Sequence, residues 1–124
     1  MSAFPCPCCG FLVFDEVGSF DNCPVCRWED DLSQLRFPRE TGANRVALIE
    51  AQQNFIRSGT SDPSRESDFG VIETPLEKDP EWRPIAGTDP IEDPVAGVDY
   101  GETYPGDPTQ LYYWRRSFWR RPVE

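Results

Sequence analysis

Four cysteines near the start of the chain are spaced as ligands of a single metal ion. Cys6 and Cys9 form one Cys-x-x-Cys pair, and after thirteen intervening residues Cys23 and Cys26 form a second. Two residues between ligands let one tight turn direct two thiolates at the same ion, and two such turns complete a tetrahedral site. All four coordination positions would then belong to the protein, which leaves none for water or substrate. The spacing therefore predicts a structural metal site rather than a catalytic one.

Zinc is the metal that this ligand set favours. Four thiolates suit tetrahedral Zn²⁺, which has no redox role to fulfil. The same four ligands can hold iron, as they do in rubredoxin, and their spacing does not separate the two metals. In zinc-finger peptides such sites contribute on the order of 10 kcal/mol of folding free energy. We therefore expect Zn²⁺ as a structural cofactor, with iron as the alternative.

Each cysteine pair lies in a sequence suited to a tight turn, called a knuckle below. Pro7 and Pro24 follow the first cysteine of each pair and stiffen the backbone. Gly10 follows the first pair and can adopt positive φ without steric cost. The fifth cysteine, Cys8, has no regular place in the metal site, because its neighbour Cys9 already serves there. We favour a small side chain packed beside the knuckle over the alternative, a reactive or redox-sensing thiol.

The elements that must position this site are few. Residues 11–14 predict a short strand leaving the first knuckle, and residues 18–21 predict a turn and strand leading to the second. Residues 31–42 contain the helix breakers Pro38 and Gly42 and predict a linking segment. The resulting plan is the two-knuckle hairpin of a zinc ribbon.

Two helices are predicted beyond the knuckles. Residues 43–57 contain no proline and carry apolar side chains at helical spacing, and Gly59 provides a C-terminal stop. Val46, Ile49 and Ile56 would share one apolar face of this helix, and Leu48 and Phe55 would widen it. Residues 108–121 predict a second helix, because Asp107 can cap it and Pro108 suits its first position. Its inward face would carry Leu111, Trp114 and Phe118.

We predict an α+β fold in three sections. Residues 1–59 would form a small zinc-ribbon hairpin with one following helix, and residues 60–107 an irregular acidic arm rich in proline and aspartate. Composition alone indicates disorder for this arm. Aromatic and aliphatic residues are nevertheless spread along it, so we expect it to dock on the core. Residues 108–124 would form a short basic, aromatic helix or tail.

Three stretches of the sequence, taken together, resemble the bacterial cysteine-rich CPCC family. They are CPCCG, CPVCRWEDD and GANRVALIEAQQNF. The resemblance covers residues 4–84 if the DPEWRP motif belongs to it. It implies a zinc-ribbon-like unit with an attached helix and metal ligands at the four paired cysteines, and it implies no defined reaction. Some relatives lie among bacterial toxin and immunity genes, which implies an inhibitory role.

The chain has a formal net charge of −10, unevenly distributed. Residues 60–107 carry thirteen acids and three bases, whereas residues 108–124 carry one acid and four arginines. Such a molecule repels nucleic acid and anionic membranes over most of its surface and attracts basic partners. We expect a basic protein partner, such as a toxin, and no membrane contact. The residues predicted to meet this partner are Glu29, Asp30, Asp31, Trp82, Glu92, Asp93 and Tyr100.

The acids directly after the second knuckle also have a purely structural interpretation. In it, Trp28 covers the metal site, and the three acids that follow cap the next segment or pair with Arg45 or Arg57. The two interpretations differ in whether these carboxylates face solvent.

The residue inventory argues against catalysis. The chain contains no histidine, its only lysine is Lys78, and it has no glycine-rich phosphate loop. We therefore expect no enzymatic activity. The N-terminal residues lack the charged and apolar regions of a signal peptide, and an odd cysteine count argues against a disulfide framework. These features predict a cytoplasmic location.

Three functions follow as hypotheses. The first is a non-catalytic, acidic, zinc-binding interaction module, of the inhibitor or immunity type, that neutralises a basic partner. The second is a nucleic-acid-associated zinc ribbon, in which the aromatics and arginines of YYWRRSFWRR contact bases and phosphates. The third is a rubredoxin-like electron carrier, which the four thiolates permit.

Overall fold

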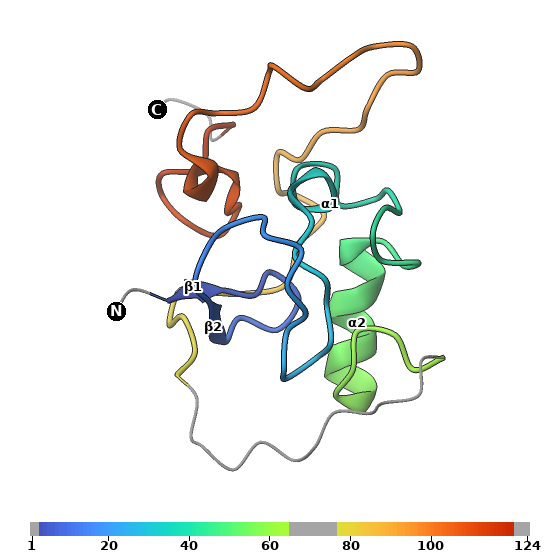
Figure 1. Cartoon of the computed structure of the whole chain (residues 1–124), viewed down its shortest axis with the longest axis vertical. Helices are drawn as coiled ribbons and strands as arrows, with labels where there is room; N and C mark the ends of the chain where they lie inside the picture. The colour runs from blue at the N-terminus through green and yellow to red at the C-terminus, as the bar shows by residue number, and fades with distance from the viewer. Residues whose placement is uncertain (1–2, 65–76, 121–124) are drawn as a thin grey trace.

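The computed structural model of the chain describes residues 3–64 and 77–120 (Figure 1). The elements in chain order are β1 (Phe4–Pro5), β2 (Leu12–Phe14), α1 (Leu32–Arg36), α2 (Leu48–Ser58) and a short 3₁₀ helix, η1 (Pro108–Leu111). Within the described residues, the strands form one two-stranded antiparallel sheet. The predicted α+β class is therefore confirmed, with most of the chain between these elements in turns and irregular segments.

The first knuckle lies at the tip of the β1–β2 hairpin. Phe4 pairs with Phe14 in an antiparallel register that is irregular at Pro5. Beyond the strands, the Cys6 amide donates to the Phe11 carbonyl at 2.8 Å. Local pairing of short strands thus places the first two sulfur ligands at a fixed end of the hairpin.

The second knuckle is held in the same way, but without a strand before it. An isolated bridge pairs Asn22 with Glu29, and the Cys23 amide donates to the Trp28 carbonyl at 2.8 Å. The prediction of a strand over residues 18–21 was wrong. Gly18 has φ 74° and Phe20 has φ 64°, and this left-handed backbone cannot continue an extended strand.

The helix α1 was not predicted, because residues 31–42 had been interpreted as a linking segment. Asp31 caps it by accepting a hydrogen bond from the Ser33 amide at 2.9 Å. The helix buries Gln34 and Leu35 and ends before the proline at position 38. A single helical turn with one capping residue is too short for periodicity to predict.

The helix α2 begins five residues after the predicted start. The side chain of Asn44 donates to the Glu29 carbonyl and accepts from the Glu29 amide, both at 2.8 Å. These contacts tie residue 44 to the second knuckle, so the backbone there is not helical. The predicted stop is confirmed, since Gly59 has φ 78° and closes the helix on the Phe55 carbonyl. Ile56 belonged to the predicted apolar face, but its side chain is 59% exposed.

The inward face of α2 is partly polar. Its buried residues are Leu48, Ala51, Gln52 and Asn54. Leu48 belonged to the predicted apolar face, and Phe55, which also did, packs partly against the core. The buried polar residues Gln52 and Asn54 were not predicted.

The predicted helix over residues 108–121 is reduced to η1. Asp107 caps it as predicted, accepting from the Thr109 amide at 3.0 Å, with Pro108 in the first turn. Residues 111–114 are all buried. Four successive residues span more than one turn of a helix and cannot all face one core, so the chain leaves the helix after Leu111.

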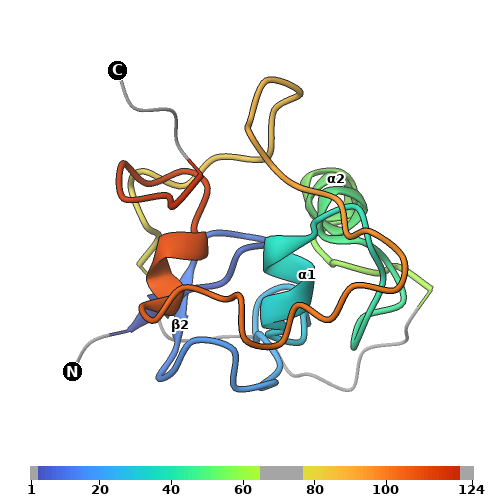
Figure 2. The same cartoon turned by 90° about the horizontal axis from the view of Figure 1, so that it is seen from above.

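The acidic arm is described over residues 60–64 and 77–107, and the second of these stretches contacts the core at both ends. The Leu12 amide donates to the Glu77 carbonyl and the Asp79 amide to the Gly10 carbonyl, both at 2.8 Å, which adds this segment to the edge of the hairpin. The later part runs alongside α1 toward η1 (Figure 2).

The contact between the arm and α1 is centred on a buried arginine. The Arg36 guanidinium pairs with Glu92 at 2.7 Å and donates to the Thr103 hydroxyl at 2.8 Å. Its central carbon lies within 5.0 Å of four ring centroids, those of Phe37, Tyr100, Tyr104 and Trp119. Three of these four rings come from the arm and tail, so a single cation joins three parts of the chain.

We expect Arg36→Met to release the arm. The substitution leaves Glu92 nearly buried without its main partner, which lowers the free energy of unfolding by about 3 kcal/mol. Urea denaturation measures that loss, and hydrogen exchange across residues 91–104 reports the release. The matched control is Arg39→Met, which breaks a pair to Asp93 whose side chains are 49% and 57% exposed. The control should cost about 0.5 kcal/mol; equal losses in the two variants would contradict the assignment.

Candidate metal centre

The four paired cysteines come together in the interior. The Sγ atoms of Cys6, Cys9, Cys23 and Cys26 all lie within 4.8 Å of one another, and all four residues are completely buried. Two of the sulfur pairs, one sulfur from each knuckle in both cases, are 3.6 and 3.7 Å apart. A Zn–S bond of about 2.3 Å gives sulfur separations of about 3.8 Å in a tetrahedron. The donor set and its spacing therefore fit one tetrahedral metal ion.

Four buried sulfurs cannot all carry a negative charge unless a cation lies among them. Burial raises the pKa of Cys6 and of Cys26 well above the ordinary thiol value. The pKa of Cys23 is lowered, because hydrogen bonds from Cys26, Cys6 and Cys9 stabilise its thiolate. Protons thus keep four buried sulfurs from carrying four negative charges. A divalent cation would take their place at the centre and release them, as metal binding to thiols does.

The two knuckles are built alike around the cluster. The Gly10 amide donates to the Cys6 carbonyl at 2.7 Å, and the Arg27 amide donates to the Cys23 carbonyl at 2.8 Å. Gly10 has φ 85° and Arg27 has φ 70°, so both knuckles close on a left-handed residue. The sequence predicted this conformation only at Gly10, since an arginine gives no such signal.

The first knuckle is covered by residues far along the chain. The Pro7 carbonyl accepts from the Gln52 side chain at 2.9 Å and from the Trp82 indole at 3.0 Å. Trp82 also packs against Gly10, where a Cβ would lie 2.6 Å from the indole Cδ2. Glycine is therefore required at position 10 for its close approach to the ring as well as for its φ.

Gln52 is a residue of the site that the sequence analysis missed. Its amide nitrogen donates to the Tyr113 hydroxyl at 2.8 Å, and its amide oxygen accepts from the Ile85 amide at 2.9 Å. It links the first knuckle, α2, the arm and the tail through one buried side chain. The available signal was a polar residue between apolar ones on the face of α2 that turns inward.

Cys8 is completely buried and lies outside the four-sulfur group. Burial raises the pKa of its thiol. A reactive cysteine needs exposure and a lowered pKa, so the structure favours the packed side chain over the redox sensor.

Asp30 and Asp31, two of the residues predicted to meet a partner, do not lie on the surface of the folded chain. Both residues are buried, at 4% and 6% exposure. Asp30 accepts from the Gly18 amide at 2.7 Å, and Asp31 caps α1 and accepts from the Ala43 amide at 3.0 Å. The contacts agree with the structural interpretation of these two acids, because both carboxylates bind backbone amides of loops around the second knuckle.

The other predicted partner residues are divided among three places in the structure. Glu29 is half-buried beside Asn44, and Trp82 covers the first knuckle. In the arm, Glu92 also lies 3.6 Å from Arg120, and the ring of Tyr100 packs edge-on against Phe37. Asp93 is exposed but paired with an arginine. The seven residues therefore do not form one surface.

The short elements and the buried four-cysteine cluster define a small α+β protein organised around a metal site. The chain belongs to the cysteine-rich CPCC family, whose model matches residues 4–78 and so includes all four cysteines. The family prediction is confirmed. A comparison with curated proteins finds no match. In the part of the chain that the structure describes, no helix combines the length and apolar character needed to cross a bilayer.

We expect Cys23→Ala to abolish metal binding and most of the folded structure, since three sulfurs cannot complete the site. The matched control is Cys8→Ala, which removes a buried thiol from the same centre but not from the four-sulfur group. Elemental analysis of metal per chain and circular dichroism separate the two variants. Full metal content in the Cys23 variant, or its loss in the Cys8 variant, would contradict the ligand assignment.

A pH dependence is expected from Asp30. Burial raises its pKa from 3.8 to about 6. The folded chain therefore keeps a proton that the unfolded chain has lost, and the associated stability is present at low pH and disappears as pH rises through about 6. Compared with Asp30→Asn, the metal-loaded wild type should gain about 1 kcal/mol between about pH 8 and about pH 5. Urea denaturation of both proteins tests this, and a difference that stays constant with pH refutes it.

Proposed function

We propose that the chain is a non-catalytic, zinc-binding protein-interaction module that inhibits a basic partner protein, as an immunity protein neutralises a toxin. The observation that carries the proposal is a closed metal centre inside a strongly acidic chain. Four buried cysteines would take every position of a tetrahedral ion, and the formal net charge is −10. The centre is thus suited to hold a shape rather than to transform a substrate.

Zinc is the proposed metal because the four thiolates match its preferred geometry without asking for redox chemistry. Cys6, Cys9, Cys23 and Cys26 would hold it, and the ion would supply a rigid link between the two knuckles. Hydrogen bonds from Gln52 and Trp82 to the Pro7 carbonyl would then fix α2 and the arm to the first knuckle. Iron in the same ligands would support the electron-carrier hypothesis, and visible absorption of the purified protein distinguishes the two metals.

The partner is proposed to be basic because the surface is acidic. Among the described residues eleven acidic side chains are exposed, against seven basic ones. Complementary charge speeds encounter and excludes wrong partners, and salt weakens it. Binding is therefore expected to fall steeply with ionic strength.

Nucleic acid is the less favoured partner. The aromatics that would stack on bases, Tyr112, Tyr113 and Trp114, are buried. Arg115 lies 3.2 Å from Asp79 and Arg120 lies 3.6 Å from Glu92, so acids of the chain itself already neutralise them. These contacts support a docked tail over a nucleic-acid surface.

The proposal predicts capture of a basic protein. Metal-loaded protein is immobilised and exposed to nuclease-treated lysate at about 0.05 M and about 0.5 M salt. The expected result is one basic protein, retained in stoichiometric amount at the lower salt, eluted at the higher, and inhibited in its own activity by the free module. Release of the captured protein by added DNA, or no retention of a basic protein, would refute the proposal.

A further inference from the structure

The loop over residues 15–21, called the acidic loop below, contains an unusual aromatic residue. Phe20 is 55% exposed and has φ 64°. The left-handed conformation is rare for a bulky residue, and backbone strain of this kind persists only where the surroundings impose it. The ring is not among the side chains packed against the core. Packing of the ring therefore does not compensate the strain.

The acidic loop is held from beneath by backbone contacts. The Phe20 amide donates to the Asp30 carbonyl, and the Asp30 amide donates to the Asp21 carbonyl, both at 3.0 Å. The Asp30 carboxylate accepts from the Gly18 amide at 2.7 Å, and Gly18 fits closely over Leu32. These contacts fix the loop beside the second knuckle and hold the ring of Phe20 out of the core. The backbone that carries this side chain is therefore held in place before a partner arrives.

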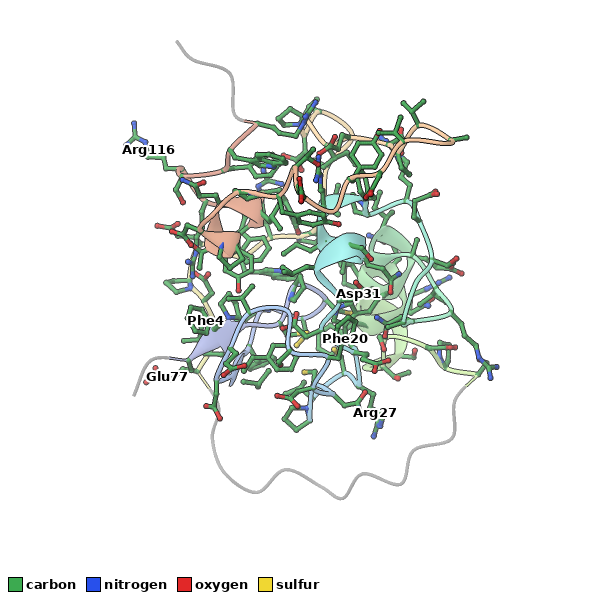
Figure 3. The ribbon with its side chains drawn as sticks, turned by 45° about the horizontal axis from the view of Figure 1, so that its top comes forward. Phe4, Phe20, Arg27, Asp31, Glu77 and Arg116 are labelled. Atoms are coloured by element: carbon green, nitrogen blue, oxygen red, sulfur yellow. The ribbon has the colours of Figure 1, made fainter. Side chains whose placement is uncertain are left out.

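Three exposed acids belong to the same loop as Phe20. Asp15, Glu16 and Asp21 are exposed, and none of the ion pairs found in the described part of the chain involves them. Figure 3 shows Phe20 well separated from Arg116 in the basic tail. In the arm, by contrast, Glu92 is paired with Arg36 and Asp93 with Arg39. The acidic loop thus combines an exposed aromatic ring with exposed acids that lie outside these ion pairs. Residues 95–102 of the arm combine the smaller exposed side chains of Val95 and Val98 with such acids, Asp99 and Glu102, and are the alternative surface.

We propose that Phe20 is the anchor of the docking surface for a basic protein. Its ring would enter an apolar pocket of that partner, and the loop carboxylates would face the partner's lysines and arginines at the rim of the interface. An aromatic anchor inside a ring of polar contacts is the usual arrangement of an interface hot spot. The inference rests on the proposed function and names the surface that performs it. Other exposed apolar residues, Ile56, Val95 and Val98, lack the strained backbone of Phe20.

A defined probe tests the surface without the natural partner. Isotope-labelled, zinc-loaded protein is titrated with the capped peptide Lys-Lys-Leu-Leu-Lys-Lys at low salt, and amide shifts are followed by NMR. The expected shifts centre on residues 15–21 and are much smaller with hexalysine, which has no apolar centre. Shifts centred on residues 95–98, equal shifts with hexalysine, or no shifts overturn the inference.

Variants separate recognition from stability. Phe20→Ala and Phe20→Gly should both abolish the peptide-induced shifts, and Phe20→Gly should have a Tm equal to or above that of the wild type, because glycine accepts the left-handed backbone. The matched control is Ile56→Ala, which trims a side chain of similar exposure, 59%, and should bind as the wild type does. A lower Tm for Phe20→Gly would make the ring structural and overturn the inference.

The inference and the proposed function fail in different ways. If Phe20→Ala still captures a basic protein from lysate as the wild type does, the loop is not the docking surface and the inhibitory function stands. If the wild type captures no basic protein, the inhibitory function fails. The peptide titration then decides by itself whether the acidic loop recognises basic, apolar surfaces.

Discussion

Four buried sulfur atoms at tetrahedral spacing are the constraint on which the structure depends. Their mutual repulsion as thiolates is large in a dry interior, so the fold is stable only with protons or a cation among them. Both knuckles close through the same backbone hydrogen bond, from the residue after the second cysteine to the carbonyl of the first. The hairpin, α1 and α2 are too short to form a core without this centre, and they are arranged around it.

Buried polar side chains join the segments that a larger apolar core would otherwise hold together. Asn44 and Gln34 join the second knuckle to the segment between the helices, and Gln52 joins the first knuckle to the arm and tail. Arg36 joins α1 to the arm through one carboxylate and four rings. Each of these side chains has several partners, and loss of one partner leaves a buried polar group unsatisfied. Such hubs make the arrangement specific, because a packing that separates a hub from its partners leaves buried polar groups unsatisfied.

Local chemistry could be predicted from the sequence, and tertiary contacts could not. The cysteine spacing, the cap at Asp107 and the stop at Gly59 depend on residues a few positions apart, and the structure has them as predicted. The start of α2 depends instead on Asn44, whose side chain is bonded to Glu29 beside the second knuckle, fifteen residues earlier. The tail lost its helix because four successive side chains turn inward. Asp30 and Asp31 looked like surface acids because sequence alone does not show which carboxylates are used to hold loops.

That distinction between internal and free carboxylates also determines where a partner can bind. The arm has the highest density of acids, but Asp79, Glu92 and Asp93 are paired with arginines from the tail, α1 and the turn that follows it. Their charge is therefore largely compensated within the chain and contributes less to attracting a partner. The acids of the loop over residues 15–21 lie next to a knuckle and take part in none of these ion pairs. A basic protein that bound there would meet a loop whose backbone is bonded to Asp30, which lowers the entropy lost on binding.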